Sequence, residues 1–253
     1  MKKLTLRIVF DVFRFCERGF ALLQGKGFGA ATIKREVSAV FSQLEQKPNL
    51  AIDIGGNIGK YSQELRRSQA DLEIHIFEPS SVNVKKLKSA FNGDPLVVIN
   101  ACGISDSVGE ATLFSNEAGS GMGSLTKRRL DHFGIDFNIK ENIQLQRFEE
   151  YWISVLKSRV IDIVKLDIEG HELEGLKSFG DALMNTKVIQ FEFGGCNIDT
   201  KSYFQDFYYF FKERDFNLAR ITPLGLQCID KYREMDEFFV TTNYVATNNR
   251  KFG

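Results

Sequence analysis

A short apolar run at residues 50–54 ends in a glycine-rich turn, Ile54-Gly55-Gly56-Asn57-Ile58-Gly59, and a helical pattern follows at residues 58–67. Such a strand–turn–helix unit is typical of open parallel α/β sheets, in which ligands bind at the carboxyl ends of the strands. Glycine lets the backbone turn sharply and approach a ligand closely. We therefore expect an α/β domain with a binding crevice at this turn.

The alternation of apolar runs and helical patterns continues along the chain. We expect further strands at residues 74–77, 96–100, 161–167, 188–193, 216–221 and 238–245, and helices at residues 80–91, 171–179 and 203–214. This rhythm predicts a mostly parallel central sheet with helices on both faces. Two stretches interrupt it: residues 106–109 predict a hairpin turn, and the polar residues 116–142 predict a lid or binding loop.

In front of the main domain, which we place at residues 49–247, residues 1–48 are predicted to form a helical segment. Four charged residues of its first helix are spaced to share one face: Arg7, Asp11, Arg14 and Arg18. This helix could pack on the main domain, which we favour, or lie on a membrane surface or a partner. Its charges argue against a transmembrane helix and a secretory signal.

Composition limits the partners and the compartment. The 253 residues include 33 basic and 33 acidic ones, so we expect no nucleic-acid substrate, which would favour a basic excess. The four cysteines lie far apart, without metal-like spacing: Cys16, Cys102, Cys196 and Cys228. Free thiols in a reducing compartment explain them best, and we expect a cytoplasmic protein.

The glycine spacing separates two classes of ligand. A dinucleotide site favours GxGxxG, whereas Ile54 stands here where the first glycine would be. The carboxylate of Asp53 would repel a pyrophosphate but suits S-adenosylmethionine, which carries an ammonium and a sulfonium. We therefore expect S-adenosylmethionine as the cofactor. The alternative is a Rossmann enzyme that binds NAD or a nucleotide sugar.

Polar residues at the next two strand ends extend this site. Glu78 follows the second strand, where a carboxylate can accept both hydroxyls of a ribose. Asn100 ends the third strand and could bind the adenine or support its pocket. Asp106 could do the same, or be a simple turn residue. The expected cofactor-binding residues are thus Asp53, Gly55, Gly56, Asn57, Gly59, Glu78, Asn100 and Asp106.

A second cluster of ionisable residues follows the strand at residues 161–167. Asp167 shares a strand face with Lys165 and should sit at the mouth of the crevice, flanked by Glu169 and His171. The cluster could hold a divalent metal or place a general base near a substrate hydroxyl. Acids that complement a helix dipole are the structural alternative for Glu172 and Glu169.

Glu192 ends the next strand and should point into the same crevice. The candidate metal ligands are therefore Asp167, Glu169 and Glu192. We assign the base for methyl transfer to His171, or to a metal held by Asp167 and Glu169. We expect the basic run at residues 127–129 to be a solvated patch, although it could bind a phosphate or an acidic sugar.

These segments resemble the FkbM family of S-adenosylmethionine-dependent methyltransferases over about residues 50–195. The matching blocks are residues 52–59, 77–79, 100–101, 105–106 with Gly109, and 165–172, of which the last is the most specific. One departure is Phe148-Glu149-Glu150-Tyr151, where the family often has a Leu-Asp pair.

The resemblance implies a class I methyltransferase fold, Rossmann-like, with a seven-stranded sheet, and O-methylation of a hydroxyl on a sugar, glycan or natural product. It also implies that Asp53, Gly55 and Asn57 shape the cofactor pocket. Asp167 and Glu169 would face the reacting centre. A non-catalytic module that retains the fold is a further alternative.

Overall fold

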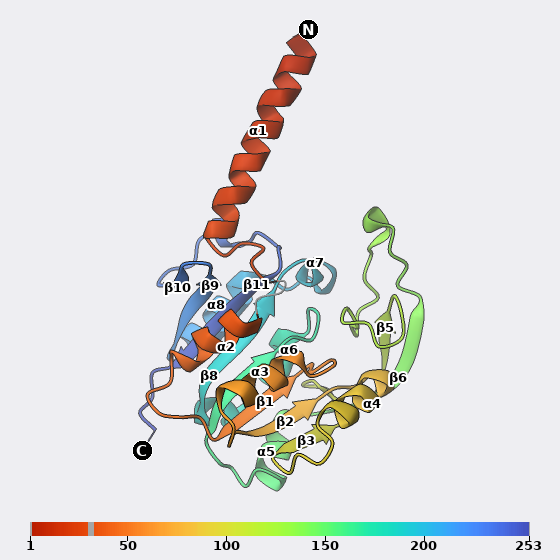
Figure 1. Cartoon of the computed structure of the whole chain (residues 1–253), viewed down its shortest axis with the longest axis vertical. Coiled ribbons are helices and arrows are strands. Elements are labelled where there is room, and N and C mark those ends of the chain that lie inside the picture. The colour runs from red at the N-terminus through yellow and green to blue at the C-terminus, as the bar shows by residue number, and fades with distance from the viewer. Residues whose placement is uncertain (1, 30–32, 253) are drawn as a thin grey trace.

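The computed structural model describes residues 2–29 and 33–252, and its centre is one large sheet (Figure 1). Its eight strands in the described residues are β1 (Leu50–Ile54), β2 (Glu73–Phe77), β3 (Val97–Asn100), β7 (Ile161–Leu166), β8 (Thr186–Phe193), β9 (Phe216–Thr222), β10 (Gly225–Cys228) and β11 (Thr242–Asn248). Their spatial order is β10-β9-β11-β8-β7-β1-β2-β3.

The strands from β3 to β8 run parallel, which confirms the mostly parallel sheet. β11 is antiparallel to both β8 and β9, and β10 pairs antiparallel with β9. The sheet thus has one strand more than the seven expected from the resemblance, because the short β10 folds back on β9 and extends the edge.

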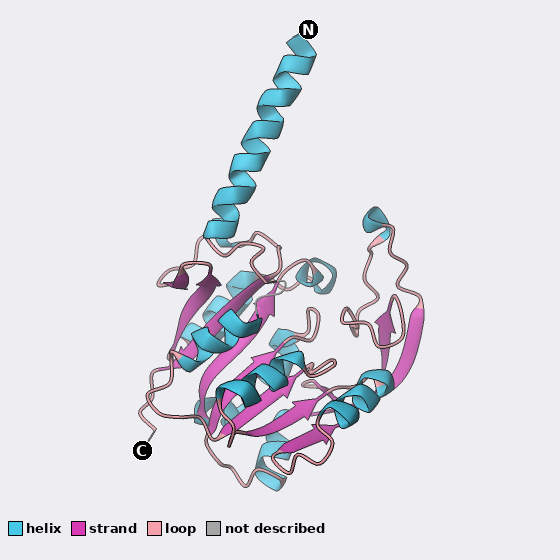
Figure 2. Cartoon of the chain, viewed as in Figure 1, coloured by secondary structure: helices cyan, strands magenta, loops and turns pink. Residues whose placement is uncertain are grey.

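Helices cover both faces of the sheet (Figure 2). On one face lie α2 (Ile33–Phe41), α3 (Lys60–Ser68) and α4 (Ser81–Ala90), and on the other lie α5 (Phe148–Ser154), α6 (Glu172–Lys177) and α8 (Phe204–Lys212). β1 contributes to both cores by alternation, with Ile52 and Ile54 on the second face and Ala51 on the first. The whole strand is therefore buried, and its carboxyl end is held rigidly.

The abundant phenylalanines fill the core on the second face. Phe191 of β8 stacks on Phe207 and Phe211 of α8, with ring centroids 5.0 and 5.2 Å apart, and on Tyr244 of β11. These rings are fully or almost fully buried. These aromatic side chains thus pack in the hydrophobic core and do not form a surface on which nucleic-acid bases could stack.

A small second sheet has the strand order β4-β6-β5, formed by β4 (Gly103–Ile104), β5 (Gly109–Ser115) and β6 (Ile139–Gln146). The hairpin predicted at residues 106–109 is wrong, because β4 and β5 both pair with β6 and not with each other. β6 also begins inside the predicted loop at residues 116–142. Only Ile143 and Leu145 of β6 are buried, so the alternation of apolar and polar residues that would predict a strand is weak there.

The two N-terminal helices differ in their surroundings. α2 packs on the sheet through Val37 and Val40, as expected. α1 (Lys2–Leu23) instead projects from the molecule (Figure 1), and its described side chains at residues 6–20 are exposed, so the expectation that it packs on the domain is wrong. Residues 1 and 30–32 of the predicted segment lie outside the described residues. No described helix has the length and apolar character needed to cross a bilayer.

The remaining elements are short. They are α7 (Cys196–Thr200) and the 3-10 helices η1 (Asp131–Phe133), η2 (Gly180–Asn185) and η3 (Glu234–Asp236). α7 follows β8 directly, and η1 lies in the long loop between β5 and β6. α7 therefore stands at the carboxyl end of β8, whereas η1 lies at the tip of a loop that projects from the small sheet (Figure 1).

Candidate functional site

Two cavities adjoin at the carboxyl ends of β1 and β7. The first lies between the turns that follow β1 and β2, the end of β7, and the loop between β5 and β6. The second lies between the same β1 turn, α2, α3 and the end of β8. Gly55, Asn57 and Asp167 line both cavities, so these three residues form the wall between them.

The glycine turn after β1 allows this close packing. Gly55 has a φ of +79°, and a Cβ there would lie 1.9 Å from the carbonyl oxygen of Asp167. A Cβ on Gly56 would lie 2.2 Å from Ile76 Cγ2. Gly59, with a φ of +82°, packs on Phe91 and precedes α3. Side chains at these positions would collide with the turn after β7, with β2 and with Phe91, so glycine is needed for the turn to pack as it does.

Glu78 organises the polar side of the first cavity. Its Oε2 accepts a hydrogen bond from the Asn57 amide at 2.8 Å, and its Oε1 accepts one from the Ser80 amide at 2.9 Å. Burial raises the pKa of Glu78, although these two amides oppose the shift. The carboxylate is thus held in place with acceptor capacity left on each oxygen.

Three buried oxygens at the first cavity have no hydrogen-bond partner within the described structure. They are Asn57 Oδ1, Ser80 Oγ and Asn83 Oδ1, and all three residues line the cavity. Ser80 precedes α4, but its hydroxyl caps no backbone amide. Buried polar atoms are nearly always paired in folded proteins. These oxygens therefore fit a ligand that brings hydroxyl or amino donors.

Asp53 lies behind the cavity wall. It is fully buried, its Oδ2 accepts a hydrogen bond from Ser62 Oγ at 2.6 Å, and its Oδ1 lies 3.6 Å from Lys165 Nζ. Asp53, Gly59, Asn100 and Asp106 are not among the described residues that line either cavity. Their contact with a cofactor stays a prediction.

Asn100 and Asp106 also have other contacts. The Asn100 amide donates to the carbonyl oxygen of Ile76 at 3.3 Å, which links the ends of β2 and β3. Asp106 is exposed in the turn between β4 and β5, where its carboxylate lies 3.5 Å from the hydroxyls of Ser105 and Ser107. Asn100 thus supports the edge beside the first cavity, whereas the carboxylate of Asp106 contacts its neighbours in the turn.

Lys165 joins the acids of the two neighbouring strands. Its Nζ lies 3.3 Å from Asp167 Oδ2 and 3.4 Å from the carbonyl oxygen of Gly55. Burial opposes the charged form, but Asp167, Asp53 and Glu36 outweigh it and raise the pKa of Lys165. Lys165 therefore stays protonated and fixes Asp167, whose side chain is 36% exposed, on the wall between the cavities.

The turn after β7 separates the predicted catalytic acids. Glu169 adopts a left-handed φ of +55°, and its carboxylate accepts from Arg128 Nη1 at 2.7 Å. Burial raises the pKa of Glu169, Asp167 adds to the shift, and Arg128 opposes it. Glu169 lines neither cavity among the described residues, so any direct role at the reacting centre stays a prediction.

Glu172 stabilises the turn that follows β7. Its carboxylate accepts hydrogen bonds from the amides of Ile168 and Gly170, as a structural acid at a helix start would. It is fully buried, and burial raises its pKa to about 7. Glu172 thus holds the turn that carries Asp167 and His171.

His171 lines the first cavity and faces the loop above it. Its Nε2 lies 3.0 Å from Thr126 Oγ1. Burial lowers the pKa of His171, although Glu174 opposes the shift. The imidazole is therefore mostly neutral at physiological pH, as a general base requires.

The second cavity contains a polar network that the sequence analysis missed. Gln190 of β8 donates to Glu36 Oε2 at 2.8 Å and accepts from the Tyr61 hydroxyl at 2.7 Å. Glu36 and Tyr61 line this cavity together with Glu192 and Asp167. The one signal in the sequence was Gln190 itself, a polar residue inside an apolar strand.

Glu192, which was expected to point into the same crevice as the cofactor site, lines the second cavity and not the first among the described residues. Burial raises its pKa, and the neighbouring carboxylates of Asp167, Glu169 and Glu172 raise it further. A carboxylate with a raised pKa is a stronger base than an exposed one. Glu192 is thus the acid of this cavity best suited to accept a proton.

The predicted metal site is not supported. No group of three His, Cys, Asp or Glu side chains in residues 2–29 and 33–252 is placed to hold a metal ion. Asp167 pairs with Lys165 and Glu169 with Arg128, whereas Glu192 lies in the second cavity. The three candidates Asp167, Glu169 and Glu192 therefore do not form one ligand set.

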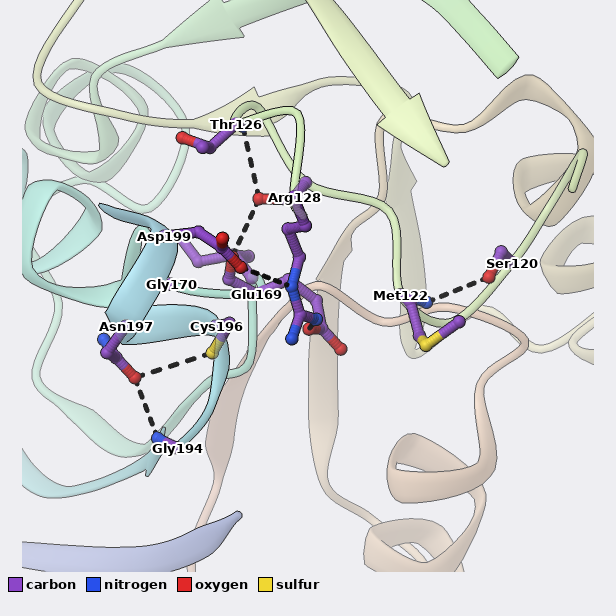
Figure 3. Close-up of polar contacts among 12 residues, drawn as sticks. Ser120, Met122, Thr126, Arg128, Glu169, Gly170, Gly194, Cys196, Asn197 and Asp199 are labelled. Carbon is purple, nitrogen blue, oxygen red and sulfur yellow. Dashed lines mark hydrogen bonds and ion pairs between the residues drawn. The ribbon is translucent and has the colours of Figure 1, made fainter. Parts of the chain in front are cut away.

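The loop at residues 116–138 covers the first cavity and is fastened to the turn after β7 (Figure 3). Ser124 Oγ donates to the carbonyl oxygen of Glu169 at 2.8 Å. Arg128 pairs with Glu169 and, at 3.3 Å, with Asp199 of α7. The side chain of Arg128 is only 11% exposed, so its expected place in a solvated patch is wrong, whereas Arg129 is 87% exposed.

The model of the methyltransferase FkbM domain matches residues 53–218. No curated protein matches the chain in sequence.

Among solved structures, a precorrin-6y C5,15-methyltransferase from Geobacter metallireducens is 10% identical, with a TM-score of 0.45 over 84% of this chain and 87% of that one. An rRNA methylase from Streptococcus thermophilus is 11% identical, with a TM-score of 0.45 over 85% and 95%. The plantazolicin methyltransferase BpumL is 9% identical, with a TM-score of 0.47 over 87% and 87%. At these values none of them identifies a substrate for this chain.

Proposed function

We propose, starting from the fact that this chain belongs to the FkbM family of S-adenosylmethionine-dependent methyltransferases, that it methylates a hydroxyl group of a sugar, glycan or natural product. The observation that carries the proposal is the shared wall of the two cavities. Gly55, Asn57 and Asp167 separate a cavity suited to a methyl donor from one suited to a hydroxyl acceptor.

The first cavity fits the donor. Glu78 offers acceptor oxygens to the ribose hydroxyls, and Asn57, Ser80 and Asn83 offer buried oxygens that need donors. Asp167 adds a partly exposed carboxylate, which favours a cationic ligand. S-adenosylmethionine, when bound, supplies a methyl group on a sulfonium, and the sulfur keeps the bonding electron pair when that methyl leaves.

The second cavity fits a neutral acceptor with several hydroxyl groups. Glu36, Tyr61 and Asn243 line it with groups that can donate or accept hydrogen bonds. A hydroxyl is a weak nucleophile, so proton removal should assist the transfer. Glu192 would accept the proton that the hydroxyl loses as its oxygen gains the methyl group. His171, on the other side of the wall, is the alternative base.

Besides proton removal, catalysis requires that the methyl donor and the acceptor hydroxyl are aligned. Lys165 fixes Asp167, and the glycine turn fixes the backbone of the wall, so donor and acceptor would meet in one geometry. The loop at residues 116–138 would keep water from the first cavity through its bonds to Glu169 and His171. Lys165, the glycine turn and the loop thus position the reactants and take no part in the transfer of the methyl group or the proton.

Calorimetric titration with S-adenosylhomocysteine and with NAD tests the donor assignment. We expect saturable binding of S-adenosylhomocysteine, weakened in N83A, which removes one unpaired oxygen, and no binding of NAD. Binding of NAD alone would contradict the proposal. Transfer of a labelled methyl group to a panel of hydroxyl and amine acceptors then tests the acceptor class, and labelling of amines alone would exclude O-methylation.

A further inference from the structure

The first helix, α1, presents a large apolar surface that no described part of the chain covers (Figure 1). Each of its large apolar side chains from residue 6 onward is at least 40% exposed: Leu6, Ile8, Val9, Phe10, Val12, Phe13, Phe15, Phe20, Leu22 and Leu23. Exposed apolar patches of this size mark interaction sites. The helix therefore needs a partner that the domain does not provide.

The charges of α1 indicate the kind of partner. Its residues 2–23 include five basic residues and two acidic ones. Arg7, Asp11, Arg14 and Arg18 share one narrow stripe along the helix, of roughly 60° at 3.6 residues per turn. Glu17 lies near the border of the apolar side. A basic stripe beside an aromatic-rich apolar face complements a surface of anionic headgroups over an apolar interior.

The breadth of the apolar side separates a membrane from a second copy of the chain. A two-stranded coiled coil buries a narrow seam of positions repeating every seven residues. Here apolar side chains point over most of the remaining circumference, so a single partner helix would leave many of them in water. A bilayer interface can bury a broad face at once. We propose that α1 lies on a membrane surface rich in anionic lipids.

The connection between α1 and the domain gives this anchor a place relative to the site. Gln24 accepts a hydrogen bond from Arg220 at 3.4 Å, and the Gly27 amide donates to Thr242 Oγ1 at 3.2 Å. Gly29 then lines the second cavity. β9, beside which this segment lies, runs parallel to β8, because both are antiparallel to β11. α1 is thus connected to the domain at the carboxyl ends of β8 and β9, the end of the sheet at which the two cavities lie.

Sedimentation of the full chain with lipid vesicles tests the proposal. We expect binding to vesicles of phosphatidylcholine mixed with phosphatidylglycerol to be about tenfold or more tighter than to phosphatidylcholine alone. F10S/F13S/F20S should lose binding to both. R7Q/R14Q/R18Q should lose the preference for anionic vesicles, as should the wild type at high salt.

Matched controls separate the anchor from general stickiness. I153S/V155S changes exposed apolar side chains at α5, far from α1, and should bind as the wild type does. The α1 variants should unfold close to the wild-type temperature, since the substituted side chains are all exposed. A wild type that stays in the supernatant with anionic vesicles would overturn the proposal. So would a stable dimer in solution that F10S/F13S/F20S dissociates, because a second copy would then cover the face.

Discussion

At the scale of single residues, charge decides what each acid at the site can do. Asp167 lies on the wall between the cavities and pairs with Lys165, which holds it in place there. Glu169 is balanced by Arg128 and turned toward the loop. Glu192 lacks such an ion pair among the described residues and lies in the second cavity. It is therefore the acid left to exchange a proton.

Substitution of Glu192 by glutamine should lower turnover by about 10²- to 10⁴-fold while S-adenosylhomocysteine binds with unchanged affinity. The wild-type rate should rise with pH as the raised pKa of Glu192 is passed, and this rise should be absent from E192Q. A pH profile of turnover for both proteins checks this. An unchanged profile in E192Q, with the rise lost in H171Q, would move the base to His171.

Glu172 should make the fold less stable as the solution becomes less acidic. Burial raises its pKa from 4.5 to about 7, so its stabilising contribution is complete below pH 4.5 and is lost as the pH rises through about 7. The loss in the free energy of unfolding should be on the order of 3 kcal/mol. Urea unfolding over this range measures it, and E172Q should lack this part of the slope. An identical slope in both proteins would contradict the assignment.

At the scale of elements, the loop at residues 116–138 connects parts of the chain that lie far apart in sequence. It links the small sheet to the turn after β7 and, through Arg128, to α7 (Figure 3). Its residues Gly121 and Leu125 line the first cavity. The loop and the turn therefore hold each other in place over the first cavity.

Replacement of Arg128 by alanine should release this loop. Two charge-assisted contacts with partly buried carboxylates would be lost, so the dissociation constant for S-adenosylhomocysteine should rise about tenfold or more. Hydrogen exchange in residues 116–130 should also become faster. R129A is the matched control, because that side chain is exposed and pairs only with the exposed Asp131 among its described contacts. Equal effects of both variants would show that loop charge, not the Arg128 contacts, matters.

At the scale of the whole molecule, the sequence was sufficient for the central sheet and insufficient for what lies against it. The class I methyltransferase fold implied by the resemblance is confirmed. β1 and β7 are buried along their whole length, and β8 is buried at six of its eight residues, as expected for central strands of a sheet covered on both faces. β6 was missed in part, since half of its side chains face water. An apolar sequence pattern predicts strands that are buried on both faces. It does not predict half-exposed strands such as β6, nor the strands with which they pair.

The site was predictable where its residues follow strands and unpredictable where they come from other elements. Gly55, Asn57, Glu78, Asp167, His171 and Glu192 all line the cavities at strand ends. Glu36 and Tyr61 come from helices, and Arg128 from a loop, so their approach depends on tertiary packing alone. Asp53 shows the reverse: its position was right, but Lys165 and Ser62 pair with it behind the wall.

A crystal structure with S-adenosylhomocysteine bound tests the central claim most directly. The account predicts the ligand in the first cavity, with its ribose hydroxyls on Glu78 and donors on at least one of the unpaired oxygens of Asn57, Ser80 and Asn83. Its sulfur should lie at the wall formed by Gly55 and Asp167. A ligand in the second cavity or elsewhere on the molecule, with Glu78 left uncontacted, would contradict the account.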